Sequence, residues 1–210
     1  MSRPYPDRFY PVVDSLDWVK RLVALGIGTV QIRAKGPGQT PLDDAAAREI
    51  VAGALALTRG TATRLVVNDY WQAAIEAGAE HLHLGQEDLA EADIPAIRRA
   101  GLTLGLSTHD EAELETALAH DPDYVALGPI YPTTLKAMRF APQGLEKIGF
   151  WKRRIGTIPL VAIGGITLER GPGVYAAGAD SIAVVSDVTA NADADGRVRD
   201  WLALAGAEPG

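Results

Sequence analysis

Residues 124–136 read Tyr-Val-Ala-Leu-Gly-Pro-Ile-Tyr-Pro-Thr-Thr-Leu-Lys, an apolar run that passes directly into a loop rich in proline and hydroxyl groups. The run Tyr124–Leu127 has the length and residue types of a buried parallel strand. We expect Gly128 to let a ligand approach the backbone, and the two prolines to stiffen the loop. The threonine hydroxyls and Lys136 can bind an anion. The segment therefore predicts a strand that ends at a binding site.

The same pattern repeats along the chain, because short β-branched runs alternate with longer runs rich in Ala, Leu and Glu. We expect strands at Phe9–Val13, Thr29–Ala34, Arg64–Asn68, His81–Leu84, Thr103–Ser107, Tyr124–Leu127, Leu160–Ile163 and Ser181–Val185. Apolar spacing predicts helices at Asp17–Leu25, Leu42–Arg59, Asp93–Ala100, Asp110–Ala119, Leu145–Arg154, Thr167–Ala177 and Asp193–Leu204. This alternation favours the α/β class and a (β/α)8 TIM barrel, with residues 1–210 forming a single domain. A doubly wound open sheet is the alternative, although it normally uses fewer strands at this length.

Local signals mark several helix ends. Asp110 followed by Glu113 resembles a capping box, with aspartate in place of the usual Ser or Thr. Glycines follow the expected helices where a left-handed cap is needed, at Gly26, Gly60, Gly78, Gly101 and Gly178. Tryptophans within helical patterns (Trp71, Trp151 and Trp201) are expected to lie in the core or at an interface.

Composition narrows the class of protein. Hydrophobic residues make up 47% of the chain and charged residues 22%, and the net charge is −7. The acidic balance argues against binding to nucleic acids or to membrane surfaces. The absence of cysteine excludes disulfides, thiolate metal sites and a cysteine nucleophile. We find neither a signal peptide nor an apolar run of roughly 20 residues, so we expect a cytoplasmic protein.

Cations gather where the second expected strand ends. Gln31, Arg33 and Lys35 alternate along one strand face, which would point inward in a barrel. Charge on an inward face is costly unless a ligand or partner compensates it, and barrel active sites form at the C-terminal strand ends. The sequence therefore predicts an anion site here. A buried ion pair that closes the barrel mouth is the alternative.

Carboxylates follow the next two strands. Asn68 and Asp69 end the third strand, and Asp88 follows the fourth. Two carboxylates on neighbouring strand ends suit Mg²⁺, which prefers oxygen ligands and keeps waters that a substrate phosphate can replace. The alternative is that Asp69 or Asp88 caps the following helix.

The last two strands end in segments typical of phosphate-binding barrels. Gly164 and Gly165 follow the seventh strand, and Val185 and Ser186 end the eighth. Asp187 is unexpected beside a phosphate, because the two negative charges repel unless the side chain points away.

The histidines give weaker signals. His81 and His83 share a strand face, but no third nitrogen ligand is evident nearby in the sequence, so we expect packed, hydrogen-bonded side chains rather than a metal pair. His109 could act as a proton shuttle or simply begin a helix.

Two anion sites, a magnesium site and no evident nucleophile together predict group transfer between two phosphorylated small molecules. Diphosphate suits such a site as the leaving group.

The order and content of these motifs resemble those of the thiamine phosphate synthase family. The matching segments are residues 10–14, 31–35, 68–69, 83–89, 105–109, 128–136, 141–145, 159–166 and 179–186. The resemblance implies a (β/α)8 barrel that joins 4-amino-2-methyl-5-hydroxymethylpyrimidine diphosphate to 4-methyl-5-(2-phosphoethyl)thiazole. It also implies a dissociative mechanism, in which diphosphate leaves before the thiazole nitrogen captures a pyrimidine methylene cation.

The resemblance also implies roles for individual residues. The pyrimidine diphosphate would contact Gln31, Arg33, Lys35, Asn68, Ser107 and Lys136. The thiazole phosphate would contact Thr133, Thr134, Leu135, Gly165, Val185 and Ser186. Asp69 and Asp88 would hold one Mg²⁺ per subunit, and Lys136, Arg33 and Ser107 would be catalytic. Leu135 departs from the family pattern, since many members carry threonine there. Apart from the resemblance, the glycine, methionine and proline near residues 136–141 predict a mobile lid there.

Two other functions stay open. A thiazole tautomerase of the same superfamily would use His109 as a base, but it needs neither Arg33 and Lys35 nor Asp88. A non-catalytic sensor of a thiamine precursor would not need the metal-binding carboxylates. The sequence leaves the oligomeric state undecided, and a homo-oligomer is compatible with it.

Overall fold

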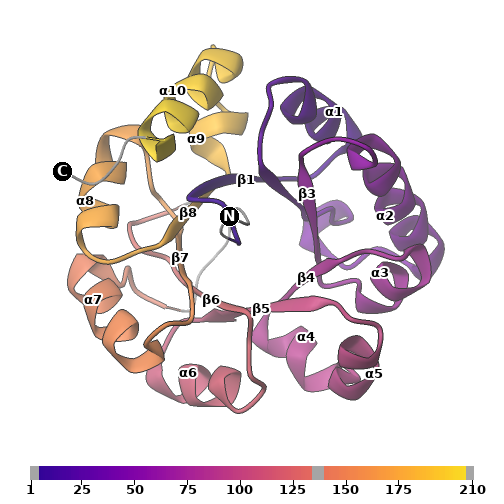
Figure 1. Cartoon of the computed structure of the whole chain (residues 1–210), viewed down its shortest axis with the longest axis horizontal. Helices are drawn as coiled ribbons and strands as arrows, with labels where there is room; N and C mark the ends of the chain where they lie inside the picture. Colours follow the sequence, from indigo (N-terminus) through magenta and orange to yellow (C-terminus); the bar gives the residue numbers. More distant parts are fainter. Residues whose placement is uncertain (1–4, 134–139, 207–210) are drawn as a thin grey trace. The chain divides into compact units, whose positions relative to one another are not determined.

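The computed structural model describes residues 5–133 and 140–206, over which strands and helices alternate (Figure 1). The strands are β1 (Phe9–Val13), β2 (Thr29–Ile32), β3 (Arg64–Asn68), β4 (His81–Leu84), β5 (Thr103–Thr108), β6 (Tyr124–Leu127), β7 (Leu160–Ile163) and β8 (Ser181–Val184). They are hydrogen-bonded in chain order and close into a barrel. The fold is therefore the (β/α)8 barrel, and the open-sheet alternative is wrong.

The helices follow the strands, from α1 in indigo to α10 in yellow (Figure 1). They are α1 (Leu16–Ala24), α2 (Asp44–Thr58), α3 (Trp71–Ala77), α4 (Gln86–Glu91), α5 (Ile94–Arg99), α6 (Glu111–Leu118), α7 (Gly144–Ile155), α8 (Gly171–Ala176), α9 (Ser186–Thr189) and α10 (Ala194–Gly206). Two short 3₁₀ helices are η1 (Pro37–Gln39) and η2 (Leu168–Arg170).

Most element boundaries agree with the sequence-based predictions to within two residues. β2 is shorter than predicted and ends at Ile32, so Arg33 and Lys35 lie beyond the strand. The predicted helix Thr167–Ala177 is divided into η2 and α8, and Pro172 occupies the first turn of α8. The sequence analysis does not predict three short helices, α3, α4 and α9, because so few residues give only a weak helical period.

The helix-end signals are largely confirmed. Each of the five glycines expected at helix ends has a positive φ, between 70° and 108°. Asp110 accepts a hydrogen bond from the Glu113 backbone N–H at 2.9 Å and so caps α6. Glu113, however, accepts from the N–H of His109 rather than from that of Asp110, so the capping box is closed one residue earlier than predicted.

The chain consists of two compact units. The unit Val12–Gly105 contains β2, β3 and β4 in parallel register, with Val30 opposite Leu65 and Val67 opposite Leu82. These strand residues are at most 4% exposed, because helices α1, α2 and α3 cover the outer face of this part of the sheet.

The other unit combines Met1–Pro11 with Leu106–Gly210. Here β8 pairs with both β7 and the start of β1, and β7 also pairs with β6. Of the three tryptophans expected in the core or at an interface, Trp151 and Trp201 are fully buried in this unit. Trp71, in the other unit, is half-buried. Trp151 donates through Nε1 to Thr108 Oγ1 at 2.8 Å, which attaches α7 to the end of β5.

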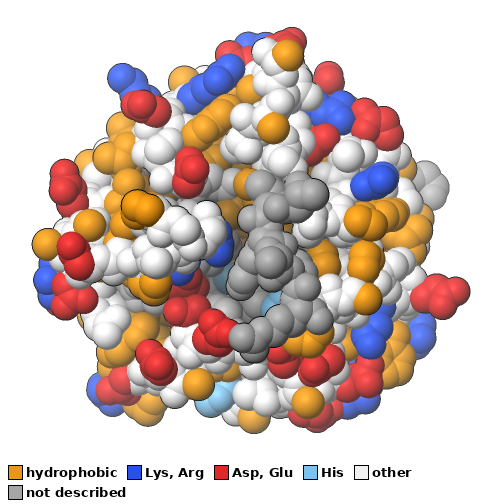
Figure 2. Space-filling view, turned by 180° about the vertical axis from the view of Figure 1, so that it is seen from behind, with side chains coloured by type: hydrophobic (Ala, Val, Ile, Leu, Met, Phe, Trp, Pro, Cys, Tyr) orange, Lys and Arg blue, Asp and Glu red, His pale blue; other side chains and the backbone are white. Residues whose placement is uncertain are grey.

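The surface agrees with the mixed charge composition. Among the described residues visible in Figure 2, acidic and basic side chains are interspersed rather than gathered into a patch of one sign. None of the described helices has the length and apolar character needed to span a membrane.

Replacing Thr108 by valine tests the buried contact between β5 and α7. The Thr108 hydroxyl accepts from Trp151 and donates to the Ala126 carbonyl at 2.9 Å. Valine leaves both groups buried without this partner, so we expect a loss of about 1–3 kcal/mol in the free energy of unfolding, measured by denaturant titration. Thr116→Val, on the exposed face of α6, is the matched control and should cost much less. Equal losses in the two variants would contradict the role given to Thr108.

Candidate active site

The predicted site residues fall into two groups, one in each unit. The first group lies in the unit Val12–Gly105, just beyond the C-terminal ends of β2, β3 and β4. Lys35 Nζ donates to Asp69 Oδ2 at 2.6 Å, and the two side chains are only 11% and 10% exposed. Arg33 instead donates to the side-chain oxygen of Gln39 at 3.1 Å. The ion pair that sequence analysis raised as an alternative is therefore present for Lys35.

Asp69 has a backbone conformation that suits a tight turn. Its φ of +65° lies in the left-handed region, where aspartate is tolerated better than most residues. Its N–H donates to His83 O at 2.9 Å, and its carbonyl accepts from Trp71 N at 2.7 Å. These bonds hold the Asp69 backbone between the end of β4 and the start of α3.

Asp88 faces Asp69. Burial raises the pKa of Asp88 to about 6, and the charge of Asp69 and a hydrogen bond with it add to that rise, while Lys35 opposes it. The two carboxylates expected at neighbouring strand ends therefore do come together. Helix capping does not explain them: neither residue is the N-cap of its helix, and the N-caps of α3 and α4, Tyr70 and Gly85, make no side-chain cap bond.

This pair has the donor chemistry for a hard cation. Within residues 5–133 and 140–206, no cluster of three or more His, Cys, Asp or Glu side chains could hold a metal. Two carboxylates fit an ion such as Mg²⁺, which takes one or two protein carboxylates and completes its shell with waters and substrate oxygens. Burial is the main cause of the raised pKa of Asp88, and the neighbouring Asp69 carboxylate adds to it, so a cation bound at this pair would favour the charged form of Asp88.

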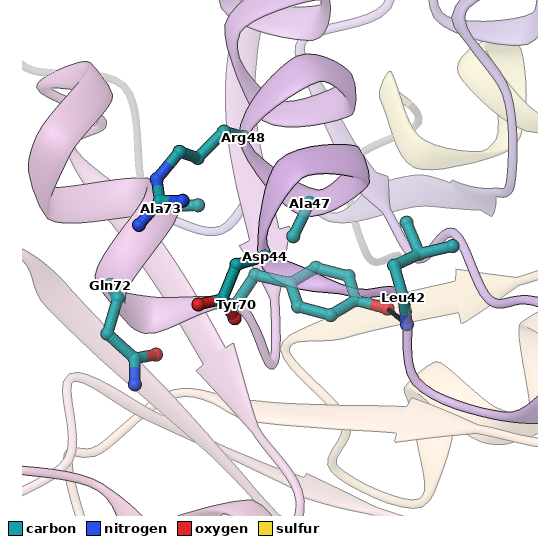
Figure 3. Close-up of a pocket in the computed structure, with 7 residues that line it drawn as sticks. All are labelled: Leu42, Asp44, Ala47, Arg48, Tyr70, Gln72 and Ala73. Atoms are coloured by element: carbon teal, nitrogen blue, oxygen red, sulfur yellow. Dashed lines mark hydrogen bonds between the residues drawn. The ribbon is translucent and has the colours of Figure 1, made fainter.

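Tyr70 attaches the segment that carries Lys35 to the start of α3. Its hydroxyl donates to the Ala34 carbonyl at 2.7 Å and accepts from Leu42 N at 3.0 Å. The Lys35 ammonium lies 5.5 Å from the centre of the Tyr70 ring, within cation–π range. Figure 3 shows Tyr70 reaching from α3 toward Leu42 in a small pocket between α2 and α3. Sequence analysis missed Tyr70, although its position directly after Asp69 was a signal.

Other predicted residues of this unit lie close to the same strand ends. Gln31 and Asn68 are 4% and 5% exposed and belong to β2 and β3. Burial lowers the pKa of His83 to about 4, so its ring is neutral at physiological pH. His81 shares a 2.7 Å hydrogen bond with Thr103 Oγ1. The expectation of packed rather than metal-binding histidines agrees with these surroundings.

The second group lies in the unit that contains β6, β7 and β8. The loop after β6 is hydrogen-bonded to the end of β7, since Ile130 N donates to Ile163 O and Tyr131 N to Gly164 O, both at 3.0 Å. A Cβ added to Gly165 would lie 2.5 Å from Pro132 O, and φ at this residue is +65°. Only glycine fits there without moving the backbone.

Gly128 has a different role from the one predicted. A Cβ at this position would lie 2.8 Å from both Cγ2 and the carbonyl oxygen of Ile163. Glycine is therefore required because β6 and β7 approach closely, and no ligand is needed to explain it.

Arg170 is a second residue that sequence analysis missed. Its Nη1 donates to the Gly165 carbonyl at 2.5 Å, and its guanidinium lies 4.4 Å from the centre of the Tyr131 ring. It therefore connects the loop after β7 with the loop after β6. An arginine five residues beyond the two glycines carries no distinctive sequence signal.

The end of β8 leads directly into α9. Val185 is the N-cap of this helix and Ser186 its first residue. Asp187 points to α10, where Arg197 and Trp201 bind its carboxylate. The sequence analysis expected Asp187 to repel a bound phosphate unless its side chain points away. The structure shows that the side chain does point away, toward Arg197 and Trp201.

The last two residues of β5, Ser107 and Thr108, point to opposite faces of the strand. Thr108 faces α7 through Trp151, so Ser107 points to the opposite face of the strand. His109 Nδ1 is hydrogen-bonded to Glu113 Oε2 at 2.7 Å, and its ring stacks on Phe140 with centroids 4.7 Å apart. Glu113 and Phe140 therefore fix the orientation of the His109 ring.

The remaining predicted residues are only partly described. Thr133 is half-buried at the end of the described part of its loop. Thr134, Leu135, Lys136 and the first part of the predicted lid lie outside the described residues.

Replacing Asp88 by asparagine should stabilise the protein in the absence of divalent cations. A carboxyl whose pKa rises from 3.8 to about 6 on folding binds more protons folded than unfolded, so its contribution to stability falls as pH increases through this window. We expect Asp88→Asn to raise Tm above pH 6 and to change it little below pH 4, measured with a chelator present. Glu87→Gln, an exposed neighbour, is the control. The same gain at both pH values would contradict the raised pKa.

Comparison with known proteins gives a consistent result. A family model described as "Thiamine monophosphate synthase" matches residues 9–188. The chain is 57% identical over 197 residues to a thiamine-phosphate synthase of Rhizobium etli, with 94% of each chain covered. It is 49% identical over 190 residues to one of Escherichia coli K12, covering 90% of this chain and 88% of the relative.

Solved structures agree. A thiamine phosphate pyrophosphorylase from Pyrococcus furiosus superposes with a TM-score of 0.80 at 25% identity, covering 94% of this chain and 95% of that one. A 3-hexulose-6-phosphate synthase, at 14% identity and a TM-score of 0.69, shares the fold. The chain therefore belongs to the thiamine monophosphate synthase family.

Proposed function

We propose that this chain condenses 4-amino-2-methyl-5-hydroxymethylpyrimidine diphosphate with 4-methyl-5-(2-phosphoethyl)thiazole to give thiamine phosphate and diphosphate. Its family membership makes it an enzyme of the transferase class in thiamine biosynthesis. We place the reaction at this site because Lys35, Asp69 and Asp88 come together beyond the strand ends. Strand C-termini are where barrel enzymes form their active sites.

The pyrimidine diphosphate would occupy the first group. Arg33 and Lys35 offer positive charge to the diphosphate, and Gln31 and Asn68 offer polar contacts to the same substrate. Ser107 and Lys136 join this set by family resemblance. In the reaction the C–O bond to diphosphate breaks and a bond to the thiazole nitrogen forms, so negative charge grows on the leaving group. Positive charge held beside the leaving group would stabilise that negative charge.

The pair of carboxylates would hold Mg²⁺. Once the ion is bound, Lys35 would no longer be needed to balance Asp69 and would become available to the diphosphate. The ion, when bound, would supply further positive charge to the departing diphosphate. We propose one ion per subunit, held by Asp69 and Asp88 together with substrate oxygens and water.

The thiazole phosphate would occupy the second group. Gly165, Val185 and Ser186 offer backbone and hydroxyl donors, and Thr133, Thr134 and Leu135 line the same loop by family resemblance. Positioning the thiazole nitrogen for attack is the main requirement in a mechanism that needs no enzyme nucleophile. A single-domain chain, a cytoplasmic location and a possible homo-oligomer stay predictions.

A coupling assay tests the function directly. Purified protein should form thiamine phosphate from the two substrates with magnesium and not after its removal by a chelator. Asp88→Ala and Lys136→Ala should each reduce kcat/KM by several orders of magnitude, as loss of charge stabilisation in a preorganised site does. Glu87→Ala, an exposed carboxylate next to Asp88, is the matched control and should keep its activity.

The assay also separates the alternatives. A thiazole tautomerase would convert its thiazole substrate without the pyrimidine diphosphate and without magnesium. A precursor sensor would bind a ligand without turnover. Unchanged coupling in Asp88→Ala would reject the proposed metal site even if the wild-type enzyme is active.

Tyr70→Phe tests how the Lys35 segment is held. The change removes the hydroxyl that bonds to Ala34 and Leu42 while the ring remains. We expect KM for the pyrimidine diphosphate to rise about tenfold, as for loss of roughly 1.4 kcal/mol of positioning energy, with little change in KM for the thiazole phosphate. Tyr175→Phe, which also loses a hydroxyl bond but in the other unit, should leave both KM values unchanged. Equal changes in the two KM values in Tyr70→Phe would reject this role.

A further inference from the structure

We propose that Arg197 is a positioning residue for the thiazole-phosphate loops, because it neutralises Asp187 and ties the segment after β8 to the segment after β7. The inference rests on the proposed function, in which Gly165, Val185 and Ser186 bind the phosphate. It concerns α10, a helix to which sequence analysis assigned no function.

The guanidinium of Arg197 binds two carboxylates, each through two hydrogen bonds. Its Nε and Nη2 donate to the two oxygens of Asp187, both at 2.9 Å. Its Nη1 and Nη2 donate to the two oxygens of Glu169, at 2.8 and 3.0 Å. Bidentate pairing of this kind fixes geometry as well as charge, and lysine cannot reproduce it. One side chain therefore connects η2, α9 and α10.

The two pairs differ in their exposure. The side chains of Arg197 and Asp187 are 17% and 8% exposed, whereas that of Glu169 is 69% exposed. Water screens the Glu169 pair, so most of the energetic coupling lies between Arg197 and Asp187. Removing Arg197 would leave Asp187 as a nearly buried charge with its main partner lost.

Trp201 gives the Asp187 carboxylate a rigid support. Its Nε1 donates to Asp187 Oδ2 at 2.7 Å. The indole is fully buried and stacks on Phe9, with ring centroids 5.0 Å apart and planes 4° apart. Phe9 pairs in turn with Ile182 of β8. Asp187 is thus held in a fixed direction, with donors from Arg197 and Trp201 on its oxygens.

The location of these contacts connects them to the phosphate. Asp187 directly follows Ser186, and Glu169 lies four residues after Gly165. Arg170, next to Glu169, binds the Gly165 carbonyl. A bare carboxylate at position 187 would repel a phosphate bound by its neighbours. Pairing with Arg197 offsets the charge of Asp187 and holds the start of α9 in place, while water screens the charge of the exposed Glu169.

Two charge variants distinguish this role from simple packing. Arg197→Met keeps the apolar stem and removes the charge. We expect it to raise KM for the thiazole phosphate about 10- to 100-fold, the effect of one uncompensated charge near the phosphate, while kcat and KM for the pyrimidine diphosphate change less than about threefold. Asp187→Asn in the same chain removes the lone charge but keeps an acceptor for Trp201, so the double variant should recover most of the loss. Higher ionic strength should also reduce the defect of the single variant.

The controls make each outcome decisive. Arg199→Met, on the exposed side of the same helix, should behave as wild type. If Arg197→Met shifts both KM values equally, or if the double variant recovers nothing, Arg197 has only a structural role and the inference is wrong. If Arg197→Met does not fold, Arg197→Lys decides, because lysine keeps the charge but cannot form the paired hydrogen bonds. A rise in KM for the thiazole phosphate alone then supports the inference, and unchanged or equally shifted KM values overturn it. Failure of the proposed function differs from all of these, because wild-type protein would then form no thiamine phosphate.

Discussion

The ion pair between Lys35 and Asp69 is the interaction on which the charged end of the unit Val12–Gly105 depends. Two carboxylates, Asp69 and Asp88, lie close together in partly buried surroundings, which is unfavourable unless a cation offsets their repulsion. Lys35 supplies part of that charge at 2.6 Å from Asp69. Burial raises the pKa of Asp88, the Asp69 carboxylate adds to that rise, and perturbed pKa values of this kind are common at functional sites.

The other unit also contains a nearly buried carboxylate whose charge must be compensated, but there the compensating group is an arginine of the protein. Asp187 is also a nearly buried carboxylate at a strand end, but its charge is matched within the protein by Arg197 and by the Trp201 indole. In our proposal, the carboxylates Asp69 and Asp88 attract a metal ion, whereas the pair of Asp187 and Arg197 allows a phosphate to bind nearby. The two strand ends therefore differ in chemistry because their carboxylates differ in compensation, although the residue type is the same.

Backbone geometry contributes as much as charge around β6 and β7. Gly128 and Gly165 have no room for a side chain, since Ile163 and the carbonyls of Tyr131 and Pro132 occupy the space. The loops after the two strands consequently form one hydrogen-bonded layer, which Arg170 reinforces through Gly165 and Tyr131. A layer of this kind can present backbone donors at fixed positions, which is what recognition of a phosphate requires.

The sequence by itself determined the order of the eight strands, the longer helices between them, the glycines at helix ends and the positions at which polar residues follow strands. These features depend on spacings of two to four residues, which are readable locally. The predicted neighbours Asp69 and Asp88 also follow from topology, because adjacent parallel strands end at the same edge. The role of Gly128 was misread, since a close approach of two backbones leaves the same sequence signal as a ligand site.

Only the tertiary structure decided which partner each charged residue takes. Lys35 and Asp69 lie 34 residues apart, and Tyr70 and Ala34 lie 36 apart. Arg197 is ten residues from Asp187 and 28 from Glu169. No local period connects such residues, and several other carboxylates along the chain could have served as well. The choice is made when packing brings two helices or loops within hydrogen-bond distance and burial penalises every charge that remains unpaired.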